Sequence, residues 1–154
     1  MTQRGYVLLA AGGSAALLLG AFGFQYFGYA PCKLCLWQRW PHGAAIVAGL
    51  MALLLPWALW LLVGALSALT TAGIGIYHTG VEKGWWEGPS SCSGTGDGLA
   101  GLSGADLLST ENAAPIVMCD EVAWALGGLS MASWNALLSL ALAMLWFEAM
   151  KRQD

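Results

Sequence analysis

Apolar stretches separated by short polar gaps run through most of the chain. No charged residue occurs at positions 5–32, 40–81 or 122–147. A helix needs roughly 20 apolar residues to cross a hydrocarbon core of about 30 Å. The first and last stretches therefore each predict one transmembrane helix, at about 6–28 and about 133–150.

The middle stretch is too long for a single crossing. As one helix from about His42 to Tyr77 it would measure roughly 50 Å, at about 1.5 Å per residue. Pro56 lies near its middle, where a proline removes a helical hydrogen bond and clashes with the preceding turn. We predict two helices, at about 36–55 and about 57–78. If Pro56 only kinks one long tilted helix, the chain has three crossings instead of four.

The predicted fold is all-α, an integral membrane four-helix bundle that forms a single membrane domain over residues 1–154. Its outer loops are expected at about 29–35 and, between the third and fourth helices, at about 79–132. The composition agrees, because only 10% of the residues are charged, against about a quarter in a soluble domain. A cleaved signal peptide over residues 1–30 is the alternative for the first helix. Its apolar run, however, exceeds the roughly 7–15 residues of a signal core.

The distribution of charge predicts the orientation in the membrane. Both termini carry basic residues, whereas the long loop holds seven acidic residues and one base, Lys83. Because basic residues stay on the cytoplasmic side, both termini are predicted to be cytoplasmic and the long loop to lie on the outer side. Lys33 and Arg39 depart from this rule, since they fall on the outer side. Such an exception beside a pair of thiols favours a functional role.

The four cysteines form two pairs with different surroundings. Cys32 and Cys35 make a C-x-x-C in the polar gap before the second predicted helix, and Cys92 and Cys119 lie in the long loop. Both pairs are predicted to face an oxidising compartment, where disulfides persist. A thiol pair beside the bilayer and a second pair in an outer loop indicate electron transfer between water and membrane. Mechanical cross-linking explains this placement less well.

The C-x-x-C is placed to form a reactive thiolate. Cys35 is predicted in the first turn of the second helix, where unpaired backbone N–H groups and the helix dipole favour an anion. Cysteine reacts as the thiolate, and nearby cations lower its pKa. Lys33 lies between the cysteines, and Arg39 follows Cys35 by four residues, on the same helix face. We favour a functional Arg39 over an arginine that merely snorkels to the headgroups.

Two other chemical interpretations concern a metal and a histidine. Structural zinc sites commonly combine two C-x-x-C-like pairs, and this chain has one, so we expect a redox pair and no metal. His78 closes the third predicted helix and would lie at the membrane level of the C-x-x-C. It either hydrogen-bonds a carbonyl ligand or is an interfacial polar residue with no chemical role.

At these residues the chain resembles the DsbB family, the disulfide bond formation proteins that reoxidise a periplasmic thioredoxin-like oxidase, DsbA, with membrane quinone. The resemblance covers essentially the whole chain. It rests on five motifs in order: Pro31-Cys32-x-x-Cys35 followed by Arg39, Tyr77-His78 with Gly80-Val81-Glu82, Trp86-x-Gly88-Pro89-x-x-Cys92, Cys119-Asp120-Glu121-Val122, and Gly128-Leu129-Ser130-Met131 with Trp134-Asn135.

The resemblance implies a relay of disulfides. Cys92 would be attacked by the thiolate of the partner, and Cys119 would exchange with Cys32. Cys35 would face the quinone, with Arg39 stabilising the thiolate and the reduced quinone oxygen. His78 matches a family histidine near the quinone. A departure from the pattern is Pro41, which would kink or delay the second helix and puts in doubt a shared helical face for Cys35 and Arg39.

The function implied is that of a thiol:quinone oxidoreductase in a bacterial inner membrane, multi-pass, with its active-site cysteines facing the periplasm. The resemblance implies ubiquinone or menaquinone as cofactor, and a periplasmic DsbA-like thiol oxidase and membrane lipid as partners; we expect no nucleic acid. One alternative is a quinone reductase similar to vitamin K epoxide reductase, which would carry its C-x-x-C late in the bundle. Another is a non-catalytic membrane scaffold with structural disulfides.

Overall fold

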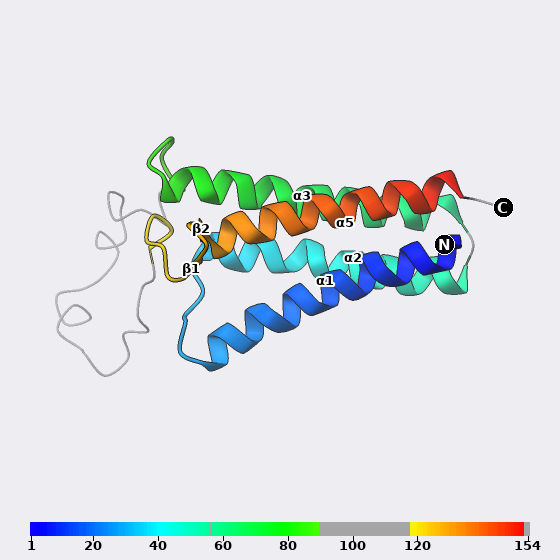
Figure 1. Ribbon diagram of the computed structural model, residues 1–154, viewed down its shortest axis with the longest axis horizontal. Helices are drawn as coiled ribbons and strands as arrows, with labels where there is room; N and C mark the ends of the chain where they lie inside the picture. Colours follow the sequence, from blue (N-terminus) through cyan, green and yellow to red (C-terminus); the bar gives the residue numbers. More distant parts are fainter. Residues whose placement is uncertain (56, 90–117, 153–154) are drawn as a thin grey trace, which may run out of the picture.

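Four long helices make up the computed structural model, which describes residues 1–55, 57–89 and 118–152 (Figure 1). They are α1 (Gln3–Tyr26), α2 (Lys33–Leu54), α3 (Ala58–Glu82) and α5 (Met131–Lys151). The predicted all-α four-helix bundle is confirmed. Both termini lie at one end of the bundle, and the α1–α2 connection and the segment before α5 lie at the other, which we call the outer end (Figure 1).

Polar side chains start three of these helices. Thr2 and Ser130 each accept a hydrogen bond from the backbone N–H three residues later, at 3.3 Å and 3.2 Å. The Cys32 sulfur does the same for α2, because Cys35 N lies 3.2 Å from it. Each cap satisfies one of the N–H groups that a helix start leaves without a partner. A cysteine of the C-x-x-C therefore also defines where α2 begins.

The predicted break in the middle stretch falls where it was expected. α2 ends at Leu54 and α3 begins at Ala58, while Pro56 itself lies outside the described residues. Pro41 behaves differently from the expectation, since α2 starts at Lys33 and continues through it. A proline removes one hydrogen bond, and α2 packs against α1 on one side and α3 on the other, so the loss does not end the helix. The predicted delay of the second helix was wrong.

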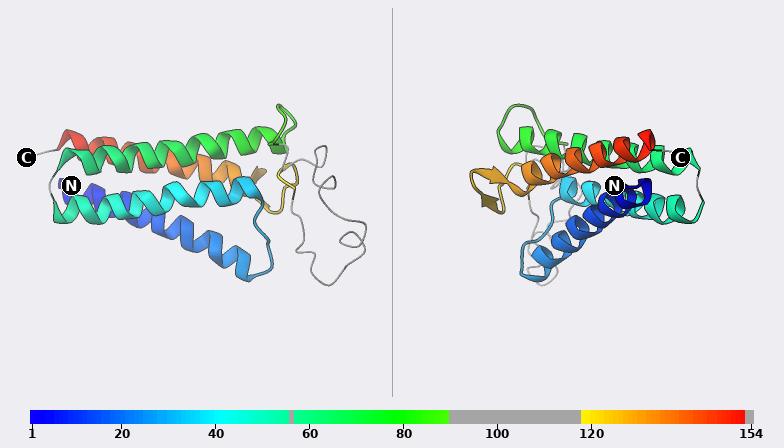
Figure 2. Two further views of the ribbon diagram at one scale, coloured as in Figure 1. Left: turned by 180° about the vertical axis from the view of Figure 1, so that it is seen from behind. Right: turned by 45° about the vertical axis from the view of Figure 1, so that its right-hand side comes forward.

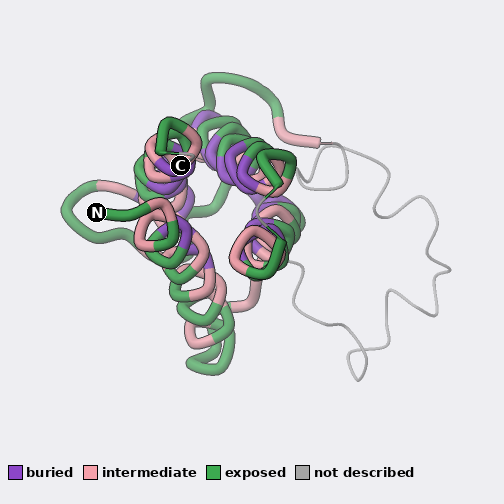
Figure 3. The backbone as a smooth tube through the Cα atoms, turned by 90° about the vertical axis from the view of Figure 1, so that its right-hand side faces the viewer, coloured by how far each residue is buried: buried purple, intermediate pink, exposed green. Residues whose placement is uncertain are grey.

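The membrane character of the helices follows from their length and composition. α1, α3 and α5 are each long and apolar enough to cross a membrane. α2 is more polar, but its 22 residues reach about 33 Å, the thickness of a hydrocarbon core. In cross-section the buried positions of the helices face one another and the exposed positions face outward (Figure 3). The protein is a multi-pass helical membrane protein.

Small residues let the helices approach closely at the end that holds the termini. Trp146 of α5 is fully buried there, among alanines of α1, α3 and α5. Its indole ring packs on Gly64 of α3, where an added Cβ would lie 2.5 Å from ring atoms.

Replacing Gly64 by alanine is therefore expected to destabilise the bundle by about 1–3 kcal/mol, because the methyl group overpacks the core. Thermal unfolding in detergent, followed by near-ultraviolet circular dichroism, measures the change. Gly73→Ala in the same helix is the matched control, since nothing lies within 4 Å of an added Cβ there. Equal unfolding temperatures for the two variants would contradict the packing argument.

At the outer end, α1 diverges from the other three helices as it approaches Tyr26 (Figures 1 and 2). There the chain forms a short antiparallel hairpin from β1 (Ala125–Leu126) and β2 (Leu129–Ser130). Gly127 and Gly128 form its turn with φ of +60° and +80°, as a two-residue hairpin turn requires. The hairpin was not predicted, although a Gly-Gly pair is a usual signal for a two-residue hairpin turn. It leads directly into the cap of α5.

Candidate active site

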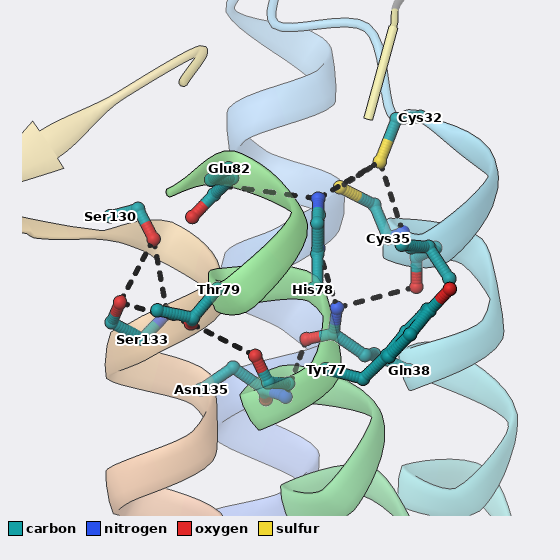
Figure 4. Close-up of polar contacts among 12 residues, drawn as sticks. Cys32, Cys35, Gln38, Tyr77, His78, Thr79, Glu82, Ser130, Ser133 and Asn135 are labelled. Carbon is teal, nitrogen blue, oxygen red and sulfur yellow. Dashed lines mark hydrogen bonds and ion pairs between the residues drawn. The ribbon is translucent and has the colours of Figure 1, made fainter. Parts of the chain in front are cut away.

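Two free thiols stand at the start of α2 (Figure 4). Cys32 precedes the helix and Cys35 lies in its first turn, and their sulfur atoms are 2.9 Å apart. Cys32 is 4% exposed, and Cys35 is half-buried. The predicted C-x-x-C is thus a compact dithiol whose sulfurs are already within bonding reach of each other.

The geometry favours a thiolate on Cys32. The hydrogen bond from the Cys35 thiol is the main cause that lowers the pKa of Cys32 from 9.0 to about 4. It outweighs burial, which raises the pKa, and a further hydrogen bond from His78 acts in the same direction. At neutral pH the pair therefore holds one proton, on Cys35, and one negative charge, on Cys32.

This charge state has a direct optical test. Thiolate absorbance at 240 nm, in a reduced protein whose two loop cysteines are replaced by serine, should titrate with a midpoint near pH 4. Above that pH Cys32 is a thiolate, and below it the thiolate absorbance is lost. A Cys32→Ser variant in the same background should lack the transition. A midpoint near the ordinary cysteine value would contradict the assignment.

His78 of α3 points at the dithiol and is only 3% exposed. Its Nε2 lies 3.5 Å from the Cys32 sulfur, and its Nδ1 lies 2.9 Å from Gln38 Nε2. The structure places His78 inside the bundle beside the thiols (Figure 4), and not at an exposed interfacial position.

Buried amide side chains determine which ring nitrogen of His78 carries the proton. Asn135 of α5 donates from Nδ2 to Gln38 Oε1 at 2.7 Å. Because the Gln38 carbonyl oxygen accepts there, its NH₂ group donates to His78 Nδ1. His78 must then carry its own proton on Nε2, the nitrogen that faces the Cys32 sulfur. The network continues inward, since His42 Nε2 lies 2.9 Å from Asn135 Oδ1.

Cys32, Cys35 and His78 also have the donor atoms of a metal site, within 4.8 Å of one another. A protonated Nε2 has no lone pair for a metal ion, and the amide network holds the proton there. The arrangement is therefore better suited to hydrogen bonding with a thiolate than to zinc. The expectation of no metal stays a prediction.

Cys119 joins the dithiol from the other cysteine pair. It is disulfide-bonded and fully buried, and it packs in one cluster with Cys32, Leu34 and Val81. Its predicted partner Cys92 lies outside the described residues. A loop cysteine and the first cysteine of the C-x-x-C are thus side by side at the outer end.

A cavity of about 350 Å³ opens beside the dithiol. Its walls come from the diverging end of α1, the α1–α2 connection, the start of α2, the ends of α3 and α5, and the hairpin segment. They are mostly apolar, and the volume lies in the range of sites for small organic ligands. Both cysteines, Arg39 and His78 line it, so every described residue of the predicted site except Cys119 faces this one space.

Within the described part of the chain, three lining residues have a buried polar atom that finds no hydrogen-bond partner: Arg39 Nε, His42 Nδ1 and Glu82 Oε2. The rest of the Arg39 guanidinium is held by α1, since Nη1 donates to Gln25 Oε1 at 2.7 Å and Nη2 to Ala21 O at 3.3 Å. A quinone is a flat apolar ring with two carbonyl oxygens, so an apolar cavity with a spare arginine donor fits it.

Sequence reasoning missed part of this site. Gln38, Asn135 and His42 had been given no role, although polar residues inside apolar spans usually face the interior of a bundle and carry function. That rule would have identified them. Their mutual contacts could not have been predicted, because the contacts of Asn135 with His42 and Gln38 join residues 93 and 97 positions apart in the sequence.

The fold and the site together define a multi-pass membrane protein with a buried dithiol beside an apolar cavity. The family model "Disulfide bond formation protein DsbB" matches residues 3–149. The chain belongs to the DsbB family, and family membership supports a disulfide-forming membrane oxidoreductase.

Two curated relatives are similar to the chain. The Disulfide bond formation protein B of Pasteurella multocida (strain Pm70) is 33% identical over 152 residues, covering 90% of this chain and 84% of the relative. An uncharacterized protein of Rickettsia prowazekii (strain Madrid E), RP370, is 30% identical over 120 residues, covering 75% of this chain and 69% of the relative. No solved structure matches the chain.

Proposed function

We propose that this protein reoxidises a periplasmic DsbA-like thiol oxidase and passes the electrons to a quinone, ubiquinone or menaquinone, bound in the cavity. The observation that carries the proposal is the dithiol in the wall of an apolar cavity that Arg39 and His78 also line. In this proposal the protein lies in a bacterial inner membrane with the outer end of the bundle facing the periplasm.

The proposed relay begins at the loop disulfide. A dithiol of the partner reduces the Cys92–Cys119 disulfide and itself becomes a disulfide. The loop dithiol then reduces the Cys32–Cys35 disulfide, by exchange between Cys119 and Cys32. Burial of Cys119 in the same cluster as Cys32 supports this exchange, because thiol–disulfide exchange requires direct contact between sulfurs.

The last step reoxidises the dithiol at the cavity. A bound quinone supplies an acceptor for two electrons. Oxidation of the dithiol forms the Cys32–Cys35 S–S bond and breaks the S–H bond of Cys35, and the two electrons and the Cys35 proton would pass to the acceptor. The Arg39 guanidinium, anchored on α1, presents its unpartnered Nε to negative charge that develops in the cavity. His78 holds the Cys32 thiolate by its Nε2–H.

The two alternatives fit the structure less well. A relative of vitamin K epoxide reductase would have its C-x-x-C late in the bundle, and here it starts the second helix. A non-catalytic scaffold gains nothing from Cys32 and Cys35 as free thiols, since a structural staple is a disulfide.

The purified protein in lipid nanodiscs tests the proposal. With a reduced thioredoxin-fold oxidase and a soluble quinone analogue, it should consume quinone, as measured by absorbance, in proportion to the partner thiols oxidised. A scaffold would consume none. Quinone that copurifies with the protein would also identify which one it uses.

A further inference from the structure

A carboxyl group lies on the far side of His78 from the dithiol (Figure 4). Glu82 is the last residue of α3, and its side chain is 5% exposed. Its Oε1 lies 3.9 Å from His78 Nε2, the same nitrogen that lies 3.5 Å from the Cys32 sulfur. Its Oε2 is buried without a partner, and the residue lines the cavity. Glu82 takes no part in the proposed relay of disulfides.

Cys32 and Glu82 lie on either side of His78 Nε2, which is 3.5 Å from the Cys32 sulfur, within hydrogen-bond distance, and 3.9 Å from Glu82 Oε1, at ion-pair distance. A thiolate and a carboxylate on either side of a single N–H repel each other, so the presence of one disfavours the other. A buried carboxylate with an unpaired oxygen is also costly, whereas the neutral acid is much less so. While Cys32 is a thiolate, Glu82 is therefore the protonated member of the pair. The titratable and charged groups around it are His78 on its own helix, Cys32 and Cys35 of α2, the adjoining Lys83, and Glu121 across the cavity.

The proton balance of the reaction requires a second proton donor besides Cys35. In its thiol–thiolate state the dithiol holds two electrons to give but only one proton, that of Cys35. Reducing a quinone to a quinol takes two electrons and two protons. One proton must therefore come from another donor in or beside the cavity.

We propose that Glu82 supplies the second proton, holding it while Cys32 is a thiolate and releasing it into the cavity when the Cys32–Cys35 disulfide forms. The proposal rests on the proposed function, in which quinone is the acceptor. The thiol–thiolate pair, the quinone and the carboxylic acid give the disulfide, the quinol and the Glu82 carboxylate. The S–S bond forms, and the S–H bond of Cys35 and the O–H bond of Glu82 break. Loss of the thiolate charge is what permits Glu82 to ionise.

The position of Glu82 also lets it recover the proton. It ends α3 at the outer end of the bundle, and the residues that follow it, Lys83 and Gly84, are exposed. The acid is thus buried toward the cavity but one residue away from water. His78 is a positioning residue in this scheme, because its Nε2–H lies between the Cys32 sulfur and the Glu82 carboxyl group and keeps its proton throughout.

Glu82→Gln tests the proposal, since glutamine keeps the shape of the side chain but has no carboxyl proton. Single-turnover oxidation of the reduced dithiol by a soluble quinone analogue is measured in nanodiscs between pH 5.5 and pH 8.5. We expect a wild-type rate nearly independent of pH. The variant should be about 100-fold slower at pH 8 and should recover about tenfold per pH unit as the pH falls, because water must then provide the proton.

Two further variants separate proton supply from structure. Glu82→Asp retains a carboxyl group and should retain most of the flat profile. Glu87→Gln removes an exposed acid at the same end of the bundle and should match the wild type. A Glu82→Gln protein with the wild-type rate at pH 8 would overturn the proposal. So would a loss of the same size at every pH, which would indicate a structural role.

A measurement without quinone tests the coupling between Glu82 and Cys32 independently of the proposed function. Infrared difference spectra compare wild-type protein reduced by dithiothreitol with protein oxidised by diamide. One protonated-carboxyl C=O band should be present in the reduced state and disappear on oxidation, and Glu82→Gln should lack it. No such change in the wild type refutes the coupling between Glu82 and Cys32. A band change in a protein that reduces no quinone supports the coupling and refutes the proposed function instead.

Discussion

Replacing Cys35 by serine is expected to abolish quinone reduction while leaving the bundle folded. Serine cannot form a disulfide with Cys32, so the electron pair has no route to the acceptor. Its hydroxyl can still donate a hydrogen bond to the Cys32 sulfur, 2.9 Å from the present Cys35 sulfur, so Cys32 should remain a thiolate. Quinone absorbance in the presence of excess reduced partner should fall only at the rate of the protein-free control.

The same variant should trap the preceding step. With Cys35 absent, a Cys32–Cys119 disulfide cannot be resolved from the C-x-x-C side, and it should accumulate. Non-reducing peptide mapping detects that cross-link, and a Cys32→Ser variant is the control that cannot form it. A Cys35→Ser protein that still turned over quinone would contradict the assignment of Cys35 to the acceptor side.

The lengths of the apolar stretches predicted the four helices, because the first and last stretches each fit one crossing of a bilayer and the middle stretch fits two. Local chemistry also predicted the break around Pro56. At Pro41 the expected delay of the helix was wrong, because α2 begins at Lys33 and continues through Pro41. α2 packs against both α1 and α3, and local propensity is a weak guide where tertiary contacts decide.

The sequence predicted which residues belong to the candidate site better than it predicted how they are arranged in space. The C-x-x-C spacing is local, so the meeting of Cys32 and Cys35 could be inferred from sequence. The approach of His78 depends on the register between α2 and α3, which periodicity leaves open. Glu82 illustrates the limit best, since its four-residue spacing from His78 is visible in the sequence, but its burial and its unpaired oxygen are properties of the folded cavity.

The buried polar network links helix packing to the environment of the Cys32 thiolate. Gln38 from α2, Thr71 and His78 from α3, and Asn135 from α5 bond across three helices. A polar group without a partner inside a membrane protein is costly, so each member restricts the positions of the others. The network thereby fixes the His78 proton on the side of the thiolate, and helix packing acts on the reactivity of Cys32.

Arg39→Ala is expected to slow quinone reduction by about 100-fold, the usual loss when one donor to a developing anion is removed. Exchange between the protein and its thiol partner should change far less, because the Cys119–Cys32 contact lies in a different cluster of residues. Stopped-flow absorbance of the quinone and gel-based trapping of the partner measure the two half-reactions separately. Equal losses in both would contradict a role on the quinone side.

The guanidinium also joins α2 to α1, so a structural effect must be separated from an electrostatic one. Gln25→Ala removes the 2.7 Å contact to Arg39 Nη1 but keeps the positive charge, and the Phe22 ring still lies 4.8 Å from the guanidinium. We expect this variant to lose much less activity than Arg39→Ala. Arg39→Lys should fall between them, because lysine restores a charge without the planar set of donors that includes Nε. If Gln25→Ala were as slow as Arg39→Ala, anchoring of α1 would be the role of the arginine, and its Nε would not act on the acceptor.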